Sequence, residues 1–91
     1  MSLDDRLAQL RAAFAERSAD DMGALRVALD TRPMDRAAAQ RIAHRFAGAA
    51  GLYGFQALGE AASALDDALE ANTDDAEVLR LFDIMQRTAH A

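Results

Sequence analysis

The amino-acid sequence predicts an all-α protein, an antiparallel up-and-down bundle of four helices that forms one domain over residues 1–91. Two observations support this fold class. The composition is 52% hydrophobic, rich in alanine, leucine and arginine and poor in β-branched residues, which favours helix over strand. Apolar residues also recur at steps of three and four along four stretches with short joints between them, so successive helices are expected to be antiparallel neighbours.

The first helical stretch runs from Leu3 to Leu29, with Ser2 as a suitable N-cap residue. Gly23 and the polar residues 18–21 lie within it, so the sequence allows either one long helix or two collinear ones. The stretch ends near the Arg32–Pro33 step, because the residue before a proline is disfavoured in helical backbone conformation.

The second and third helices are predicted from about Met34 to Ala50 and from about Phe55 to the break at Asn72–Thr73. Each has an apolar face at helical spacing, and the spacing in the third helix is the most regular in the chain. The residues of these faces are Ala38, Ile42, Phe46 and Ala49 in the second helix and Phe55, Leu58, Ala62, Leu65 and Leu69 in the third.

The fourth helix is expected to begin at Asp74, because an aspartate followed three residues later by Glu77 is typical of a capping box. Its apolar residues again follow helical spacing, which gives the bundle a fourth stripe to bury. The residues expected to be buried are Val78, Leu81, Phe82 and Met85.

Cysteine is absent, which excludes disulfides and thiolate metal sites and fits a reducing compartment, so we expect a cytoplasmic protein. No apolar run approaches the roughly 18 residues that span a bilayer, and the acidic N-terminus does not resemble a signal peptide. His44 and His90 are far apart in the sequence and no other ligands converge on either, so neither a metal ion nor a cofactor is expected.

The formal net charge of −5 argues against general nucleic-acid binding, which depends on neutralising phosphates. The charge is unevenly distributed, because residues 32–48 hold four arginines and one aspartate, a local charge of +3. A basic segment on an acidic body favours attraction of a small anionic group to one place.

His44 is the candidate functional residue of the second helix. It is two residues from Ile42 and from Phe46, so at about 100° per residue it points about 200° away from each of these apolar side chains. A glycine within a helix costs about 1 kcal/mol relative to alanine, so Gly48 is expected either to let another helix pack closely or to let a partner approach the imidazole. The neighbours of His44 on the same strip of helix are Gln40, Arg41, Ala47, Gly48 and Gly51.

The segment 44–55, with the leucine spacing that follows it, resembles the histidine-containing phosphotransfer (HPt) domain. The family pattern is a histidine, any residue, an apolar residue, a lysine, a glycine and then a run of small residues to a glycine at the turn. The sequence matches it at His44, Phe46 and Gly48, in the small-residue run and at Gly54. The resemblance covers the whole chain, since the family is a four-helix bundle with its histidine on the second helix.

This resemblance implies a phosphorelay carrier that has no kinase activity of its own. His44 would accept a phosphoryl group from the phosphoaspartate of a receiver domain and pass it to another receiver, with a hybrid histidine kinase as a further partner. Asp66 matches the family's glutamine or acidic residue that faces the histidine, and we expect it to bond Nδ1 and leave Nε2 as the nucleophile. The protein would be a monomer, and the receiver would dock on Gln40, Ala47, Gly48 and Gly51.

The sequence departs from the family pattern at Ala47, where the family usually has a lysine. Arg41 is the first candidate to supply a cation to the phosphoryl group, and Arg45, about 100° around the helix from His44, is the second. Ala47 also favours an alternative function, a docking module with the same bundle that transfers no phosphate. A further alternative is the phosphorylated N-terminal domain of a chemotaxis-type histidine kinase. The lack of a further domain in the chain argues against this alternative.

Overall fold

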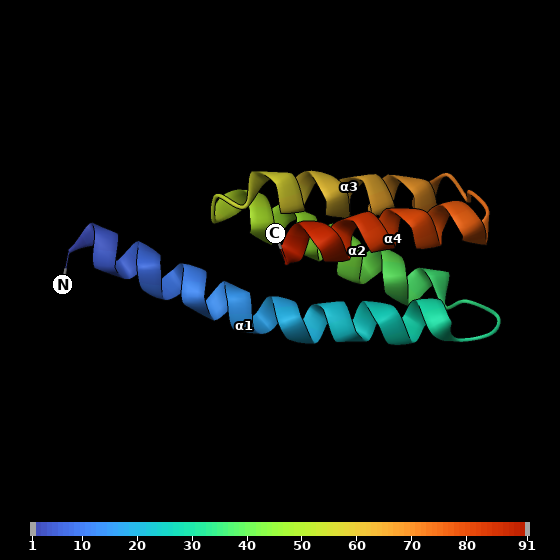
Figure 1. Ribbon diagram of the computed structural model, residues 1–91, viewed down its shortest axis with the longest axis horizontal. Coiled ribbons are helices and arrows are strands. Elements are labelled where there is room, and N and C mark those ends of the chain that lie inside the picture. The colour runs from blue at the N-terminus through green and yellow to red at the C-terminus, as the bar shows by residue number, and fades with distance from the viewer. Residues whose placement is uncertain (1, 91) are drawn as a thin grey trace.

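Four helices make up the computed structural model, which describes residues 2–90 (Figure 1). They are α1 (Leu3–Asp30), α2 (Arg36–Leu52), α3 (Gln56–Glu70) and α4 (Asp75–Ala89), and there is no strand between residues 2 and 90. Successive helices run in opposite directions, so the all-α up-and-down bundle expected from the sequence is confirmed. Over the same residues, no helix combines the length and the apolar character needed to cross a membrane.

α1 is one continuous helix, which decides between the single helix and the two collinear ones that the sequence allows. A reciprocal capping box starts it: the Asp5 N–H donates to Ser2 Oγ at 3.1 Å, and the Ser2 N–H donates to the Asp5 carboxylate at 3.4 Å. At the other end, Thr31 has extended backbone and its N–H donates to the Val27 carbonyl. Gly23 does not interrupt the helix, whose hydrogen bonding continues on both sides of it.

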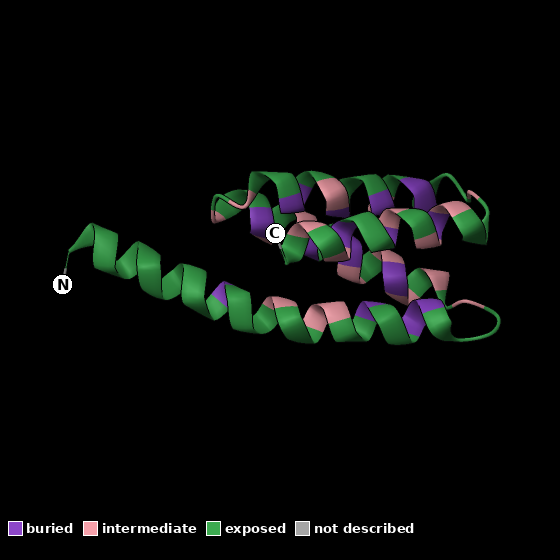
Figure 2. Cartoon of the chain, in the orientation of Figure 1, coloured by how far each residue is buried: buried purple, intermediate pink, exposed green. Residues whose placement is uncertain are grey.

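The N-terminal turns of α1 extend beyond the rest of the bundle, because α1 has 28 residues and α3 and α4 have 15 each (Figures 1 and 2). Leu3, Leu7 and Leu10 are 73%, 40% and 41% exposed, whereas Phe14, the next residue of the same stripe, is buried. The sequence predicts this apolar stripe, but its first turns lie outside the core.

The buried face of α2 differs from the predicted one, and α2 begins and ends about two residues later than expected. α2 packs against both α1 and α3, so small alanines occupy the line that faces the centre of the bundle and the larger Ile42 lies at its side. Of the predicted residues only Phe46 is fully buried, together with Ala39, Ala43 and Ala50, whereas Ala38, Ile42 and Ala49 are half-buried.

The turn between α2 and α3 requires Gly54, whose φ of +85° lies in the left-handed region. The Phe55 N–H donates to the Ala50 carbonyl at 2.9 Å and so closes the last turn of α2. The ring of Phe55 stacks on the ring of Phe14 in α1 with a centroid distance of 5.3 Å, and the centroid of the Tyr53 ring lies 5.6 Å from that of Phe14. These aromatic contacts attach the turn to α1 at Phe14, next to the N-terminal turns of α1 that extend beyond the bundle.

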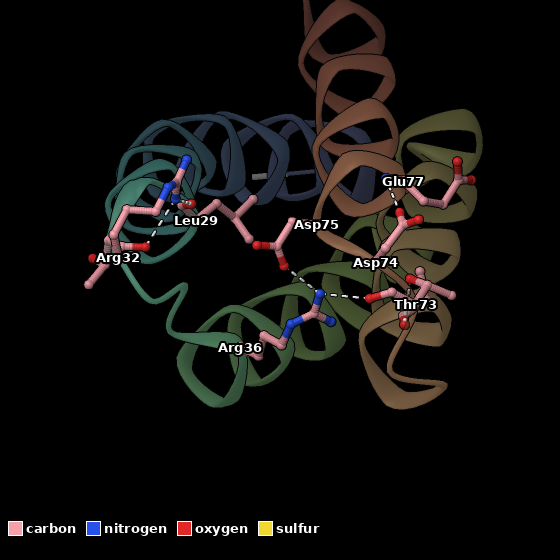
Figure 3. A network of polar contacts seen from close by, with 9 residues as sticks. Leu29, Arg32, Arg36, Thr73, Asp74, Asp75 and Glu77 are labelled. Carbon is pink, nitrogen blue, oxygen red and sulfur yellow. Dashed lines mark hydrogen bonds and ion pairs between the residues drawn. The ribbon is translucent and has the colours of Figure 1, made fainter.

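Arg36 holds the opposite end of the bundle together (Figure 3). Its Nη2 donates to the Thr73 carbonyl and to the Asp75 carboxylate, each at 2.6 Å. One side chain therefore ties the start of α2 to the turn between α3 and α4.

α4 begins after Asp74, as predicted, and the Asp74 carboxylate accepts a hydrogen bond from the Glu77 N–H at 2.9 Å. The predicted capping box is only half present, because the Glu77 carboxylate pairs with an arginine one turn further along α4 instead of returning to Asp74. Leu81, expected in the core, is half-buried, while Val78, Phe82 and Met85 are buried as predicted.

Candidate functional site

His44 lies on the surface of α2, directly after the buried Ala43, and its side chain is 81% exposed. Because the core line of α2 passes through Ala43, His44 lies about 100° around the helix from it. The ring is therefore at the edge of the seam between α2 and α3, not on a ridge opposite the core, and it is open to the approach of another protein.

Asp66 of α3 makes the contact with His44 that the family resemblance leads us to expect. Its Oδ2 lies 2.8 Å from His44 Nδ1. Asp66 follows Leu65, which is fully buried, so core packing holds the carboxylate at the seam, where it is 13% exposed. An ionised carboxylate only accepts hydrogen bonds, so Nδ1 carries the proton and the lone pair of Nε2 faces outward.

The contact raises the pKa of His44 above the ordinary value of 6.5. The hydrogen bond to Asp66 is the largest cause and the negative charge of the same carboxylate is the next; desolvation opposes them, and the charge of Glu70 adds the smallest contribution. The other oxygen of Asp66, Oδ1, is buried and has no hydrogen-bond partner between residues 2 and 90. The hydrogen bonding of this carboxylate is therefore directed at His44.

A second polar contact crosses the same seam one helical turn away, where Gln40 Nε2 donates to Glu70 Oε2 at 2.7 Å. Gln40 and His44 are four residues apart on α2, as are Asp66 and Glu70 on α3, so the two contacts form successive rungs between the helices. Glu70 was not expected from the sequence, although its spacing of four from Asp66 was a usable signal. A shallow depression beside the ring is lined by Ala37, Gln40, Arg41, His44 and Glu70.

On the other side of His44 the surface consists of small side chains. A shallow depression there runs from Ala47 and Gly51 on α2 to Gly59 and Ser63 on α3. A Cβ built on Gly48 or on Gly51 would meet no atom within 4 Å, so Gly48 does not serve close helix packing. That packing occurs at Gly59, which the sequence analysis overlooked: a Cβ there would lie 3.3 Å from Gly51 N and 3.4 Å from the Ala47 carbonyl oxygen.

The two candidate cations lie on different flanks of α2. Arg41 is exposed and lines the depression that contains His44. Arg45 pairs with Asp21 of α1, with Nη2 2.8 Å from the Asp21 carboxylate. The structure therefore brings Arg41, and not Arg45, beside the His44 ring.

The remaining histidine, His90, is the C-cap of α4, and its backbone N–H bonds to carbonyls of the last turn. In the part of the chain that the structure describes, no group of three or more histidine, cysteine, aspartate or glutamate side chains is placed to hold a metal ion. The arrangement at His44 thus offers one nucleophilic nitrogen at an open surface, with a carboxylate behind the ring.

A helical bundle that presents a histidine to solvent, with Nδ1 bonded to a carboxylate on the next helix, has the features of a phosphoryl carrier protein. The nucleophile is accessible to a partner, and the carboxylate stabilises the ring once it is charged. The family model of the Hpt domain matches residues 9–91, and the chain belongs to this family. Hpt domains are phosphotransfer carriers of phosphorelays, as the resemblance seen in the sequence implies. Comparison with curated proteins and with solved structures gives no match.

Proposed function

We propose that this protein carries a phosphoryl group on Nε2 of His44, accepting it from the phosphoaspartate of one receiver domain and passing it to the aspartate of another. The observation that carries this proposal is the 2.8 Å contact between Nδ1 and Asp66 on a side chain that is 81% exposed. The contact leaves the Nε2 lone pair free, and the exposure lets a macromolecular partner reach it.

In the accepting step the Nε2 lone pair attacks phosphorus, the bond between phosphorus and the aspartyl oxygen breaks, and the receiver's aspartate leaves as a carboxylate. No proton leaves Nδ1, so the ring becomes positively charged, and Asp66 stabilises that charge across the hydrogen bond. The donating step reverses these events on the second receiver. The receiver supplies the metal ion and most of the transition-state stabilisation, so the carrier needs no kinase activity.

The receiver is expected to dock around His44, over Gln40 on one side of the ring and over the small residues Ala47, Gly48 and Gly51 on the other. The open position at Gly48 supports this, because its helix penalty of about 1 kcal/mol is not offset by packing against another helix. Arg41 lies in the adjacent depression and supplies a cation near the phosphoryl group. The proposal implies that the protein binds receivers and a hybrid histidine kinase transiently, and that it does so in the cytoplasm. The four helices would act together as one domain.

Ala47 favours a second candidate function, a docking module that binds receivers without accepting phosphate. In the family a lysine usually stands at this position, three residues after the histidine. Both candidates use the same surface, so only a transfer measurement distinguishes them.

The test is incubation of the purified protein with receiver domains that carry a labelled phosphoryl group. We expect label on the wild-type protein that is lost in acid and survives alkali, as a phosphoramidate does, and none on His44→Gln. His90→Gln is the matched control and should be labelled like the wild type. Binding to receivers without any labelling would favour the docking module, and labelling by ATP and Mg²⁺ alone would contradict the assignment of a carrier without kinase activity.

A further inference from the structure

The first eight residues of α1 form an overhang (residues 3–10) whose apolar stripe is left without a partner. Leu3, Leu7 and Leu10 follow steps of four and three along the helix and are 73%, 40% and 41% exposed. None of the three belongs to the core or packs against it as a half-buried residue. A short helix standing alone in water is only marginally stable, so an amphipathic overhang gains from an apolar partner along this stripe.

An apolar groove lies at the base of the overhang, between α1, the α2–α3 turn and the end of α4. Its walls include Phe14 and Ser18 of α1, Phe55 and Leu58 at the start of α3, and Ala89 of α4, and its volume is about 500 Å³. Phe14 lines this groove and follows the overhang leucines along the same side of α1, although it is itself buried. The stripe and the groove therefore adjoin each other on one side of the molecule.

We propose that a second copy of this chain covers this surface, through antiparallel pairing of the two α1 helices about a twofold axis between Leu10 and Arg11. With the axis there, a residue before the axis in one copy lies opposite the residue that is equally far after the axis in the other copy. Leu7 of one copy is then level with Phe14 of the other, and Leu3 is level with Ser18. Each overhang enters the groove of the other copy, which makes the interface self-complementary and closed.

The charges along α1 favour the antiparallel direction. Residues 3–10 hold two aspartates and one arginine, whereas residues 11–18 hold two arginines and one glutamate. Antiparallel pairing places the acidic half of each helix beside the basic half of the other, while parallel pairing would place like charges together. In the proposed register Asp4 is level with Arg17 of the other copy, although within one copy the two are about 20 Å apart along the helix.

The proposed dimer differs from the monomer that the sequence leads us to expect. Its interface is small, two overhangs in two grooves, so the copies are expected to exchange and the dimer to depend on concentration. In sedimentation equilibrium between about 1 μM and 1 mM, the wild-type mass should rise from 9.8 kDa toward twice that value. A wild-type protein that stays at 9.8 kDa over this range would overturn the proposal.

A matched pair of variants tests the stripe. Leu7→Glu places a charge on the stripe and should keep the protein monomeric. Ala12→Glu places the same charge on the exposed, opposite face of α1 and should dimerise like the wild type. Circular dichroism confirms that both variants keep their helices. Equal dimerisation of the two variants would contradict an interface on the stripe.

Two further measurements test the register. The chain has no cysteine, so Leu10→Cys, close to the twofold axis, should form a disulfide-linked dimer in a glutathione redox buffer, whereas Ala12→Cys should form no disulfide-linked dimer. Asp4→Arg should weaken the dimer, and adding Arg17→Asp should restore it, because the two residues meet only between copies. Failure of the reversed pair to restore dimerisation, or equal cross-linking of both cysteine variants, would rule out this register. Neither readout depends on phosphoryl transfer.

Discussion

The two ring nitrogens of His44 have different surroundings, and this difference decides where a phosphoryl group can attach. Nδ1 faces the Asp66 carboxylate at 2.8 Å, while the rest of the ring is exposed. A histidine on an open helix surface without such a partner exchanges its proton between both nitrogens. In the proposed function Asp66 is therefore a positioning residue that holds the proton on Nδ1, and this role is open to two tests at the scale of single residues.

Replacing Asp66 with alanine removes the main cause of the raised pKa of His44. In NMR titrations of the ring, the pKa of His44 in Asp66→Ala should fall back toward 6.5. Phosphoryl transfer should slow by roughly tenfold, the rate equivalent of one hydrogen bond to a charged group. A variant with the wild-type titration curve and the wild-type rate would show that Asp66 neither orients the ring nor stabilises its charge.

If His44 transfers a phosphoryl group as proposed, its raised pKa also sets the pH range of transfer. The neutral ring is the nucleophile, because a proton on Nε2 occupies the reacting lone pair, so the rate should fall as the pH drops through the raised pKa of His44. This loss begins at a higher pH than for an ordinary histidine at 6.5. The same shift favours the folded protein below the pKa of the unfolded chain and ceases to contribute as the pH rises past the folded pKa. With one receiver preparation, Asp66→Ala should shift the midpoint of the rate profile to lower pH, and an unshifted midpoint would mean that the profile belongs to the receiver.

Arg41 and Ala47 show whether the carrier contributes charge near the phosphoryl group. Exposed cations have small effects in water and larger ones when a docked receiver excludes solvent. We therefore expect Arg41→Ala to slow transfer and Ala47→Lys to speed it or prolong phospho-His44, each by a factor of a few. Arg45→Ala is the control and should leave the rate unchanged, because Arg45 pairs with Asp21 on the other flank. If neither Arg41→Ala nor Ala47→Lys changes the rate, the receiver supplies all of the positive charge near the phosphoryl group.

At the scale of helices, two glycines on the α2–α3 seam are expected to behave differently. Gly48→Ala adds a methyl group in open space, so it should raise the free energy of unfolding by about 0.5–1 kcal/mol through helix propensity. Gly59→Ala places its methyl group 3.3 Å from backbone of α2, so crowding should cancel that gain. Urea unfolding measures both. If Gly48 is kept for docking, Gly48→Ala should also slow transfer while it stabilises the protein, and equal stabilisation by the two variants would contradict the close approach at Gly59.

Local signals explain how much of each helix was predictable. The caps at Ser2 and Asp74 and the arginine–proline step after α1 place helix ends within a few residues, because capping depends on neighbours in the sequence. The buried face of α2 was assigned wrongly, because periodicity reveals a stripe but not the two helices that cover it. Ile42 is the largest apolar residue of its stretch and still lies at the side, since the centre needs the smaller Ala39 and Ala43.

The site was predictable to a different degree. The exposure of His44 followed from helical spacing, but its place at the edge of the α2–α3 seam did not, because the buried face of α2 was assigned wrongly. Its pairing with Asp66 was expected only through the family resemblance, because single-sequence patterns do not reveal contacts between helices. For the same reason Glu70 and Gly59, which depend on the register between α2 and α3, were missed. Gly48 was singled out correctly as an unusual residue, and the structure then excluded one of its two explanations.

At the scale of the whole molecule, the protein has two exposed features on different elements, the His44 seam of α2 and α3 and the overhang of α1. The molecule measures 48 × 21 × 19 Å, and the overhang extends it along its longest axis (Figure 1). Because Leu3, Leu7 and Leu10 lie outside the core, the folding of the bundle and the chemistry of His44 are expected to be independent of the overhang.

Deleting residues 2–8 tests this independence in one variant. At concentrations where the protein is monomeric, the deletion should change the free energy of unfolding by less than about 1 kcal/mol, because it removes no core side chain. The His44 titration curve should be unchanged. At high concentration the wild type should melt at a higher temperature than the deletion variant, because the proposed dimer stabilises the folded state by mass action, and the difference should vanish on dilution. A large loss of stability at every concentration would instead show that the overhang supports the monomer.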